Sequence, residues 1–349
     1  MLIFYIALFS LALWNIKFSG KNFFKEESFS RDVTDSIKGI FIWLVFFSHF
    51  KGYAKYTTPL DLAGKEISTF LGQLIVACFL FYSGYGVCEA IKKKGTSYVK
   101  SIPKKRVFST LVKFDIAVLI YLLIAVLRGK TYELKTILLS LVGWESVGNS
   151  NWYIFVILGL YLITFVSFII VRKNLPVAAL LTTILTGAFV IFLYVEKQSW
   201  WYDTAACYAL GIWVSVFKDK ILSFITKNNI TWSLCALLSL GGFCATYLLP
   251  HKHLIGKIIY LSVAPFFCLV IMVLLTKFRI SNKVLIFSGQ YLFEIYILQR
   301  IPMIILKDLK VSEFNIYVFF VLCVAITIPL ALIYRKLTSI KLSSLKKSK

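Results

Sequence analysis

Residues 31–50 read RDVTDSIKGIFIWLVFFSHF, and this stretch decides which kind of fold the chain adopts. A polar, charged approach leads directly into an apolar run that ends at His49 and Phe50. In an α-helix, Lys38 and His49 are separated by three turns plus about 20°, so they share one face. Asp35 precedes Lys38 by three residues and is predicted to pair with it. The stretch therefore predicts a helix with an ion pair at one end of a face and an imidazole about 16 Å farther along it.

The composition of the chain is that of a membrane protein. Its 349 residues are 59% hydrophobic and 16% charged, with a mean hydropathy of +0.81. Apolar runs recur along the whole chain, and in lipid they must be helical because each backbone polar group needs an internal partner. We therefore predict an all-α, polytopic membrane bundle of about eleven transmembrane helices. The predicted spans are 1–16, 37–54, 67–91, 107–127, 151–171, 176–195, 204–217, 229–249, 258–276, 284–306 and 314–334.

The net charge of +23 comes from Lys and Arg residues in short loops beside the predicted spans, which favours membrane orientation over nucleic-acid binding. One alternating set of loops carries 26 of these residues and the other carries 11. The positive-inside rule predicts that the first set is cytoplasmic, with the amino terminus outside and the carboxyl terminus inside. His49 then lies toward the outer half of the bilayer. The seven cysteines lie in apolar segments without metal-like spacing, so no metal site is predicted.

Two neighbouring stretches depart from a plain apolar pattern. Ser83, Gly84 and Gly86 thin the third predicted span, so another helix backbone can approach closely, as in ordinary small-residue packing. The loop 92–106 follows and carries seven positive charges, the densest group in the chain. These charges serve either orientation and anionic lipid binding or the binding of a phosphorylated cofactor.

A third interruption, YLFEIYILQRIP at 291–302, places Glu294, Gln299 and Arg300 inside an apolar span. Ionisable groups inside a membrane are costly and usually face a partner or a cavity, so this stretch favours a functional site. The short apolar piece 136–148 is predicted to be re-entrant or interfacial.

Taken together, these stretches resemble the acyltransferase family 3 membrane proteins, which O-acylate sugars. In that family a D-x-x-R-G pattern is followed by a His eleven residues after the Arg; Asp35, Lys38 and His49 occupy those places, with Lys for Arg. The family's F-x-x-S-G-x motif is similar to residues 79–85. Its late S-Y-x-I-Y-L-x-H element is similar to residues 293–299, with Gln299 where His is common.

The resemblance implies a domain organisation and an activity. It would make residues 31–334 a ten-helix acyltransferase domain, preceded by an extra transmembrane helix and cytoplasmic loop at 1–30 and followed by a basic cytoplasmic tail at 335–349. It implies an O-acetyltransferase in the bacterial cell membrane, of the capsule or exopolysaccharide type, with acetyl-CoA as acyl donor and a polysaccharide or lipid-linked sugar as acceptor. Acetyl-CoA would be a substrate, so no bound cofactor is expected.

The resemblance also assigns roles to single residues. His49 is the expected general base or acylated residue, and these alternatives stay open. Asp35 and Lys38 form either a catalytic or a positioning pair, and Lys38 is one of the expected donor contacts together with Lys105 and Arg106. The family's second basic position corresponds to Ser109, so one donor contact is absent. The residues expected to line the substrate cavity are Ser83, Trp152, Glu294, Tyr296 and Gln299.

Two readings compete with an acyltransferase at His49. A transporter or flippase for polysaccharide or lipid-linked sugar shares the many spans and the intramembrane charges, although no internal repeat is evident. The other histidines, His251 and His253, fall in a loop expected to be solvated and outside. A buried structural role for His49 is the remaining alternative. The acceptor sugar and its hydroxyl do not follow from the sequence.

Overall fold

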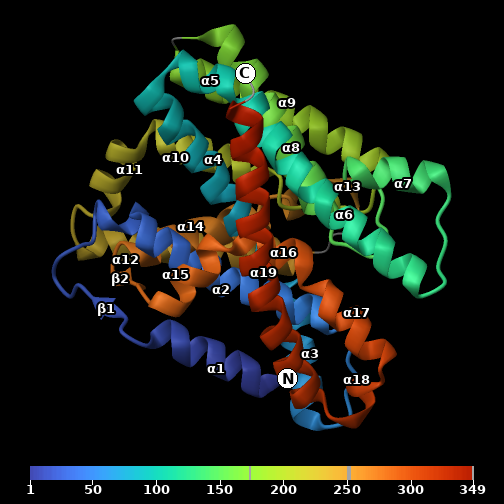
Figure 1. Cartoon of the computed structure of the whole chain (residues 1–349). Coiled ribbons are helices and arrows are strands. Elements are labelled where there is room, and N and C mark those ends of the chain that lie inside the picture. The colour runs from blue at the N-terminus through green and yellow to red at the C-terminus, as the bar shows by residue number, and fades with distance from the viewer. Residues whose placement is uncertain (173, 250–252, 348–349) are drawn as a thin grey trace.

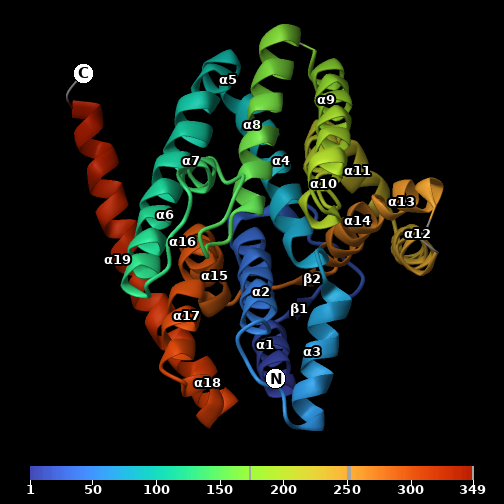
Figure 2. The same cartoon turned by 90° about the vertical axis from the view of Figure 1, so that its right-hand side faces the viewer.

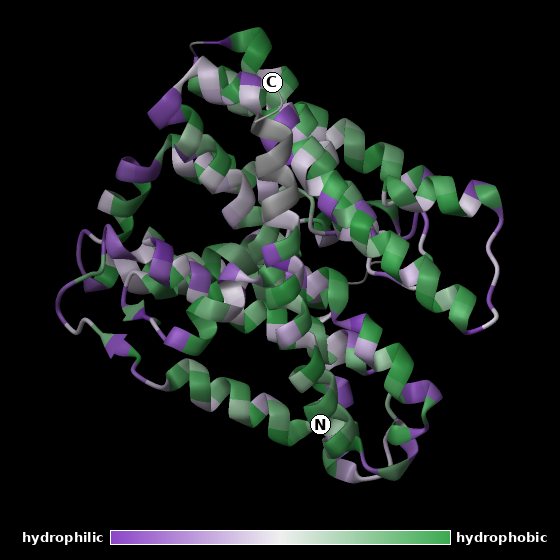
Figure 3. Cartoon of the chain, in the orientation of Figure 1, coloured by the Kyte–Doolittle hydropathy of each residue, from purple (hydrophilic) through white to green (hydrophobic). Residues whose placement is uncertain are grey.

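Helices make up nearly all of the secondary structure in the computed structural model, which describes residues 1–172, 174–249 and 253–347, with side chains described as far as residue 339. One two-stranded antiparallel ribbon, formed by β1 (Lys17–Phe18) and β2 (Phe278–Arg279), completes the architecture. The expected all-α polytopic membrane bundle is confirmed. Figure 3 shows why: apolar residues dominate the helices, and hydrophilic residues gather in the connecting segments.

Eight helical stretches among the described residues are long and apolar enough to cross a membrane. Figures 1 and 2 show them packed into one bundle, with α19 running along its side. The stretches are α2 (Arg31–Phe50), α4 (Leu74–Lys94), α8 (Trp152–Val171), α9 (Leu175–Glu196), α12 (Asn229–Leu248), α19 (Ile316–Lys347), the run of α5 (Thr96–Ile102), η2 (Pro103–Phe108) and α6 (Ser109–Leu127), and the pair α13 (Leu254–Tyr260) and α14 (Val263–Leu275).

The other three predicted spans are helical but shorter or interrupted. They form α1 (Leu2–Leu13), α10 (Ala206–Val216) and the consecutive helices α15 (Lys283–Gln290), α16 (Leu292–Leu298) and α17 (Arg300–Asp308). In the described chain the spans of full length therefore number eight rather than eleven. Hydropathy counts apolar residues and does not locate the places where a helix stops or turns.

The predicted span at 67–91 also starts later than expected. Gly72, with a φ of 45°, ends a separate helix, α3 (Pro59–Leu71), so the span begins at Leu74. The predicted re-entrant piece, 136–148, begins inside the short helix α7 (Leu134–Leu141) and continues as a loop that leads toward α8. The remaining short elements are η1 (Glu27–Phe29), α7 (Leu134–Leu141), η3 (Ser199–Trp201), α11 (Lys218–Ile225) and α18 (Val311–Phe314).

Two helix pairs in the centre of the bundle are held at backbone contact by glycines. A Cβ atom on Gly39 of α2 would overlap the carbonyl of Leu285 in α15, and one on Gly289 would overlap the carbonyl of Asp35 in return. The indole nitrogen of Trp43 donates to Ser288 at 3.0 Å along the same contact. Close backbone approach through small residues replaces the hydrophobic effect as a source of helix association in lipid. The contact fixes the orientation of α2, which carries His49.

The pair α4 and α10 repeats this arrangement. A Cβ atom on Gly84 would overlap the carbonyl of Tyr208, and one on Gly211 would overlap the carbonyl of Phe81. The sequence-based expectation of a close backbone approach at Gly84 is confirmed. Gly86 differs, because a Cβ atom there would meet nothing within 4 Å.

Loops of the two alternating sets gather on opposite sides of the bundle. On the first side, here named the basic face, Lys25 donates to Ser223 at 3.0 Å and Arg279 pairs with Glu27 at 2.7 Å. On the other side, the opposite face, Lys55 pairs with Glu313 at 3.0 Å. Figure 1 shows β1, β2 and α11 on one flank and α7, α13 and α17 on the other. The chain therefore has two polar faces separated by the apolar helices.

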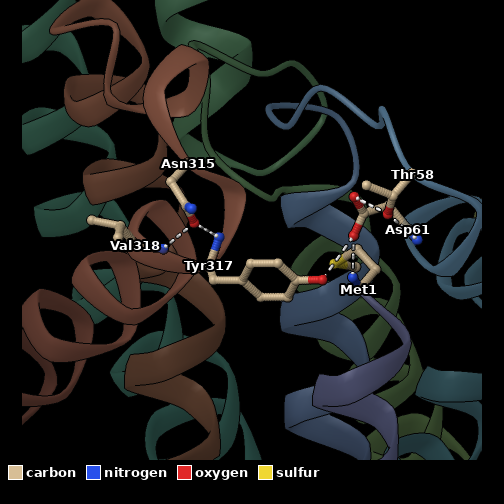
Figure 4. A network of polar contacts seen from close by, with 6 residues as sticks. All are labelled: Met1, Thr58, Asp61, Asn315, Tyr317 and Val318. Atoms are coloured by element: carbon tan, nitrogen blue, oxygen red, sulfur yellow. Dashed lines mark hydrogen bonds and ion pairs between the residues drawn. The ribbon is translucent and has the colours of Figure 1, made fainter.

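A buried ion pair ties the first helix to the opposite face. The amino group of Met1 lies 2.6 Å from a carboxylate oxygen of Asp61, and both groups are almost completely buried. Figure 4 shows that the hydroxyl of Thr58 donates to the same carboxylate, at 2.8 Å, and that Tyr317 of α19 reaches it at 3.4 Å. Asn315 caps the start of α19 through the backbone of Tyr317. One carboxylate thus joins α1, α3 and α19.

We expect Asp61→Asn to lower the free energy of unfolding by about 3–5 kcal/mol, because it leaves a buried ammonium group without its counter-ion. Burial alone would raise the pKa of Asp61, but hydrogen bonds from the Met1 amine and from Thr58 outweigh it and hold that pKa below its ordinary value. The folded pKa lies below the unfolded one, so this contribution is present above about pH 4 and is lost as the pH falls further.

Thermal unfolding of the detergent-solubilised protein as a function of pH tests this prediction. The loss of stability caused by Asp61→Asn should be complete at neutral pH. The difference in stability between the wild type and the variant should become smaller only in acid. Asp32→Asn is the matched control, since Asp32 is an exposed carboxylate in the first turn of α2. Equal stability of the two variants at neutral pH would contradict the structural role of Asp61.

Candidate functional site

His49 lies in the last turn of α2 and is partly buried. Its Nδ1 atom is buried and has no hydrogen-bond partner among the described residues. The helix is held there by aromatic contacts to α19, in which the ring of Phe50 lies 4.8 Å from that of Phe319 and 5.2 Å from that of Phe320. Buried polar atoms in folded proteins are nearly always hydrogen-bonded. A buried imidazole nitrogen without a partner therefore indicates a position where a ligand can bind.

Tyr296 of α16 faces His49, with 6.1 Å between the ring centroids. Its hydroxyl is also buried without a hydrogen-bond partner in the described chain. Gln299 follows on the same segment; its Nε2 donates to the carbonyl of Tyr296 at 3.3 Å, whereas its Oε1 has no partner among the described residues. Three sequence-predicted residues thus contribute three unsatisfied polar atoms to one connected group.

Helices α8 and α4 contribute two more of the predicted residues. The ring of Tyr153 on α8 lies 5.4 Å from that of Tyr296, and Ser83 of α4 lies within hydrogen-bonding reach of the Tyr153 hydroxyl. Trp152 stands beside Tyr153 with 6.1 Å between ring centroids. The structure therefore connects Ser83 and Trp152 to the His49 group through Tyr153, a residue that the sequence analysis did not select.

Arg300 was identified from the sequence as a charge inside an apolar span, but it was not predicted to belong to the site. Its Nε donates to the hydroxyl of Tyr53 at 2.9 Å and its Nη1 donates to the carbonyl of Asn149 at 3.2 Å. The guanidinium is close enough to His49 to interact with it electrostatically. A fixed cation within electrostatic range of an imidazole can help to stabilise an oxyanion that develops there. The sequence did contain an indication that Arg300 belongs to a site, because an Arg within an apolar stretch usually faces a partner or a cavity.

Arg106 lies toward the basic face in a turn of unusual geometry. The segment Pro103–Phe108 is a π-helix between α5 and α6, a form that is rare and concentrated at functional sites. The Nε of Arg106 donates to the hydroxyl of Tyr98 at 3.0 Å, and its guanidinium lies 5.9 Å from the centroid of the Tyr161 ring. Lys105 is exposed beside it.

A run of tyrosines connects Arg106 with the His49 group. We name it the tyrosine series, and it consists of Tyr98, Tyr161, Tyr208, Tyr153 and Tyr296. The rings of Tyr161 and Tyr208 lie 6.1 Å apart, and Tyr153 lies within electrostatic range of both and of Tyr296. These residues come from α5, α8, α10 and α16, so no periodicity within one helix reveals them. They give the bundle a polar interior between the two faces.

Asp35 and Lys38 form the predicted pair, with 3.2 Å between the carboxylate and the ammonium group. Arg31 also reaches Asp35, at 3.5 Å. This arrangement agrees with the positioning alternative; contact of Lys38 with a donor stays a prediction. The pair lies about three to four helical turns before His49, so the two groups occupy different ends of α2.

The structure connects Glu294 with a different neighbour. Its carboxylate is buried and forms an ion pair with Arg335 of α19, at 2.9 Å, and Arg335 also donates to the carbonyl of Gln290. The described contacts of Glu294 therefore join α16 to α19 and do not include the His49 group. Removing either charge would leave the other one unpaired inside the protein.

Among the described residues, no other histidine belongs to this group. His251 lies outside the described residues, and His253 is the residue that precedes α13. Within the described chain, no three His, Cys, Asp or Glu side chains are grouped so that they could hold a metal ion.

This set of groups is suited to acyl transfer. An unprotonated imidazole nitrogen can accept the proton of an attacking hydroxyl, and Arg300 and Tyr296 carry donors for a developing oxyanion. The apolar helices around the group exclude water, which protects a reactive ester or thioester from hydrolysis.

Comparison with known proteins agrees with this chemistry. Residues 34–335 match the family model described as an acyltransferase domain. The match begins one residue before Asp35, ends at Arg335 and includes every candidate residue named above. Neither a curated protein nor a solved structure matches the chain.

Proposed function

Because this chain belongs to acyltransferase family 3, we propose that it transfers an acetyl group from acetyl-CoA to a hydroxyl of a cell-surface polysaccharide. The observation that carries the proposal is the orphaned Nδ1 of His49, buried beside Tyr296 and Arg300 at the inner end of the tyrosine series. A transferase needs a base at the point where donor and acceptor meet. His49 lies between the tyrosine series and the end of α2, which faces the opposite side of the bundle.

We infer that the basic face is cytoplasmic and receives the donor. Its excess of Lys and Arg supports this orientation, as does Arg106, whose guanidinium is held next to two tyrosines. A phosphate of acetyl-CoA would pair with Arg106 and Lys105, and the pantetheine arm would extend along the tyrosine series and bring the thioester to His49. The acceptor would approach from the opposite face.

The proposed reaction at His49 balances without any further reactant. The imidazole takes the proton of the acceptor hydroxyl, whose oxygen attacks the thioester carbonyl. Arg300 and the Tyr296 hydroxyl stabilise the oxyanion that forms. The carbon–sulfur bond then breaks, the sugar ester forms, and the proton passes from His49 to the departing thiolate of CoA.

Mass spectrometry of surface polysaccharide tests the function as a whole. Cells that produce the protein should carry an added acetyl mass that cells without it lack. If the amount of polysaccharide changes while its acetylation does not, the transporter alternative replaces the proposal.

For the donor side, we expect Arg106→Gln to raise the KM for acetyl-CoA by about 10-fold or more, because one charge-assisted contact contributes about 1.5–3 kcal/mol. The kcat should change little, since Arg106 lies far from the reacting atoms. Lys104→Gln is the matched control, because Lys104 is an exposed cation in the same π-helical turn. Acetyl transfer by purified protein in lipid nanodiscs measures both constants. Equal KM values for the two variants would contradict donor binding at Arg106.

A further inference from the structure

A pocket of about 280 Å³ opens on the opposite face, next to the end of α2. It lies between α6, the loop that follows α6, and α17. Three tyrosines and three cations are prominent in its lining: Tyr53, Tyr121, Tyr132, Arg128, Lys130 and Lys307. Asp308 adds one carboxylate. The pocket therefore combines flat aromatic surface with an excess of positive charge.

The charge balance of this pocket differs from that of its surroundings. Arg128 donates to Asp308 at 2.7 Å, which neutralises one cation. Lys130 and Lys307 are exposed, and the described residues supply neither of them with an ion-pair partner. The ammonium group of Lys307 lies 5.7 Å from the centroid of the Tyr53 ring. Two cations thus remain available to a ligand.

Membrane orientation does not account for these cations. The loops of the opposite face hold 11 of the Lys and Arg residues, against 26 on the basic face. The positive-inside rule disfavours basic residues in short loops on the poorer face, yet three of them converge on one pocket. A functional reason for their placement is the better explanation.

Two lining residues of the pocket are bonded to the segments that carry the candidate site. The hydroxyl of Tyr53 accepts a hydrogen bond from Arg300, whose guanidinium lies within electrostatic range of His49. The backbone nitrogen of Tyr53 bonds to the carbonyl of Phe50, so the pocket begins one turn after His49. On the other wall, the hydroxyl of Tyr121 donates to the carbonyl of Ile297 at 3.0 Å, next to the segment that carries Gln299. A ligand in the pocket would lie at the entrance to the imidazole.

We propose that this pocket binds the acceptor and selects an anionic glycan, an inference that rests on the proposed transferase function for the identity of the ligand. Lys130 and Lys307 pair with carboxylate or phosphodiester groups along the glycan chain. Tyr53 and Tyr132, which are partly exposed, present their faces to the sugar rings. Arg128 neutralises the charge of Asp308, which would otherwise repel the incoming anion. A neutral sugar chain makes the aromatic contacts alone and binds more weakly.

Binding of defined oligosaccharides to the protein in lipid nanodiscs, in the absence of acetyl-CoA, tests the inference. The probes are a hexuronate oligomer, a phosphodiester-linked sugar oligomer and a neutral glucan of equal length. At least one anionic probe should bind about 10-fold or more tightly than the glucan, and its Kd should rise with salt concentration. The preference between the two anionic probes identifies the acidic group.

The double variant Lys130→Gln/Lys307→Gln should lose most of the preference for the anionic probe and leave glucan binding unchanged. Lys135→Gln is the control, because Lys135 is an exposed cation of α7 near the pocket but outside its lining. Equal binding of all three probes, or an unaltered preference in the double variant, overturns the inference. Selective anion binding without any acetyl transfer supports the pocket and refutes the proposed function, so the two failures are distinguishable.

Discussion

His49→Gln should reduce acyl transfer by about 10²- to 10⁴-fold, the usual contribution of a positioned general base. Glutamine keeps polarity and similar length but does not accept a proton at neutral pH. The structure also predicts that the bundle tolerates the change, because Nδ1 of His49 has no hydrogen-bond partner to lose among the described residues. We therefore expect this variant to lose transfer activity while it keeps its thermal stability.

Single-turnover acetyl transfer in nanodiscs measures the first quantity and thermal unfolding the second. His253→Gln is the control, since His253 precedes α13 and lies apart from the site. A His49→Gln protein that transfers acetyl at the wild-type rate would refute the assignment. A variant that unfolds at a much lower temperature would instead identify His49 as a structural residue.

Gly84→Ala should destabilise the bundle by about 3 kcal/mol or more, at the upper end of the cost of overpacking. The added methyl group would overlap the carbonyl oxygen of Tyr208, which is main chain and cannot rotate away. The helices α4 and α10 would have to separate, and Tyr208 would move with α10. We expect impaired transfer in whatever protein still folds, because Tyr208 belongs to the tyrosine series.

Gly86→Ala provides a control on the same helix, two residues away. A Cβ atom there meets nothing within 4 Å, so alanine removes only the conformational freedom of glycine. That change stabilises a helix by roughly 0.5–1 kcal/mol. Thermal unfolding of the two variants should therefore shift in opposite directions. Similar shifts would show that helix propensity, rather than the backbone contact, dominates at Gly84.

Features that depend on residues close together in the chain could be predicted from the sequence. The pairing of Asp35 with Lys38 follows from helical spacing, and the glycine at position 84 signalled a close backbone approach. The apolar segments were all found, since hydropathy is a property of local composition. The division of 284–306 into three helices was not predicted, because its polar residues indicated a site and did not mark where α15 and α16 end.

Contacts between distant helices could not be predicted in the same way. Arg300 and Tyr53 are 247 residues apart, and only the packing of α17 on the end of α2 brings them together. Glu294 shows the opposite case: its burial in an apolar span suggested a site, but its carboxylate pairs with Arg335, 41 residues later. One sequence does not reveal which helix faces are in contact, so it does not separate a structural charge from a functional one.

The two attachments of α1 have a consequence for the order in which the protein is built. The amino end of α1 is held by Asp61, 60 residues away, whereas the chain that follows its other end pairs through Lys17 with Arg279. At about 5–20 residues per second, the ribosome adds Arg279 roughly 10–45 s after Asp61. During that interval the first helix is anchored at one end only. The β1–β2 ribbon therefore forms late in synthesis. It fixes the amino-terminal segment to the bundle after most of the other helices have been made.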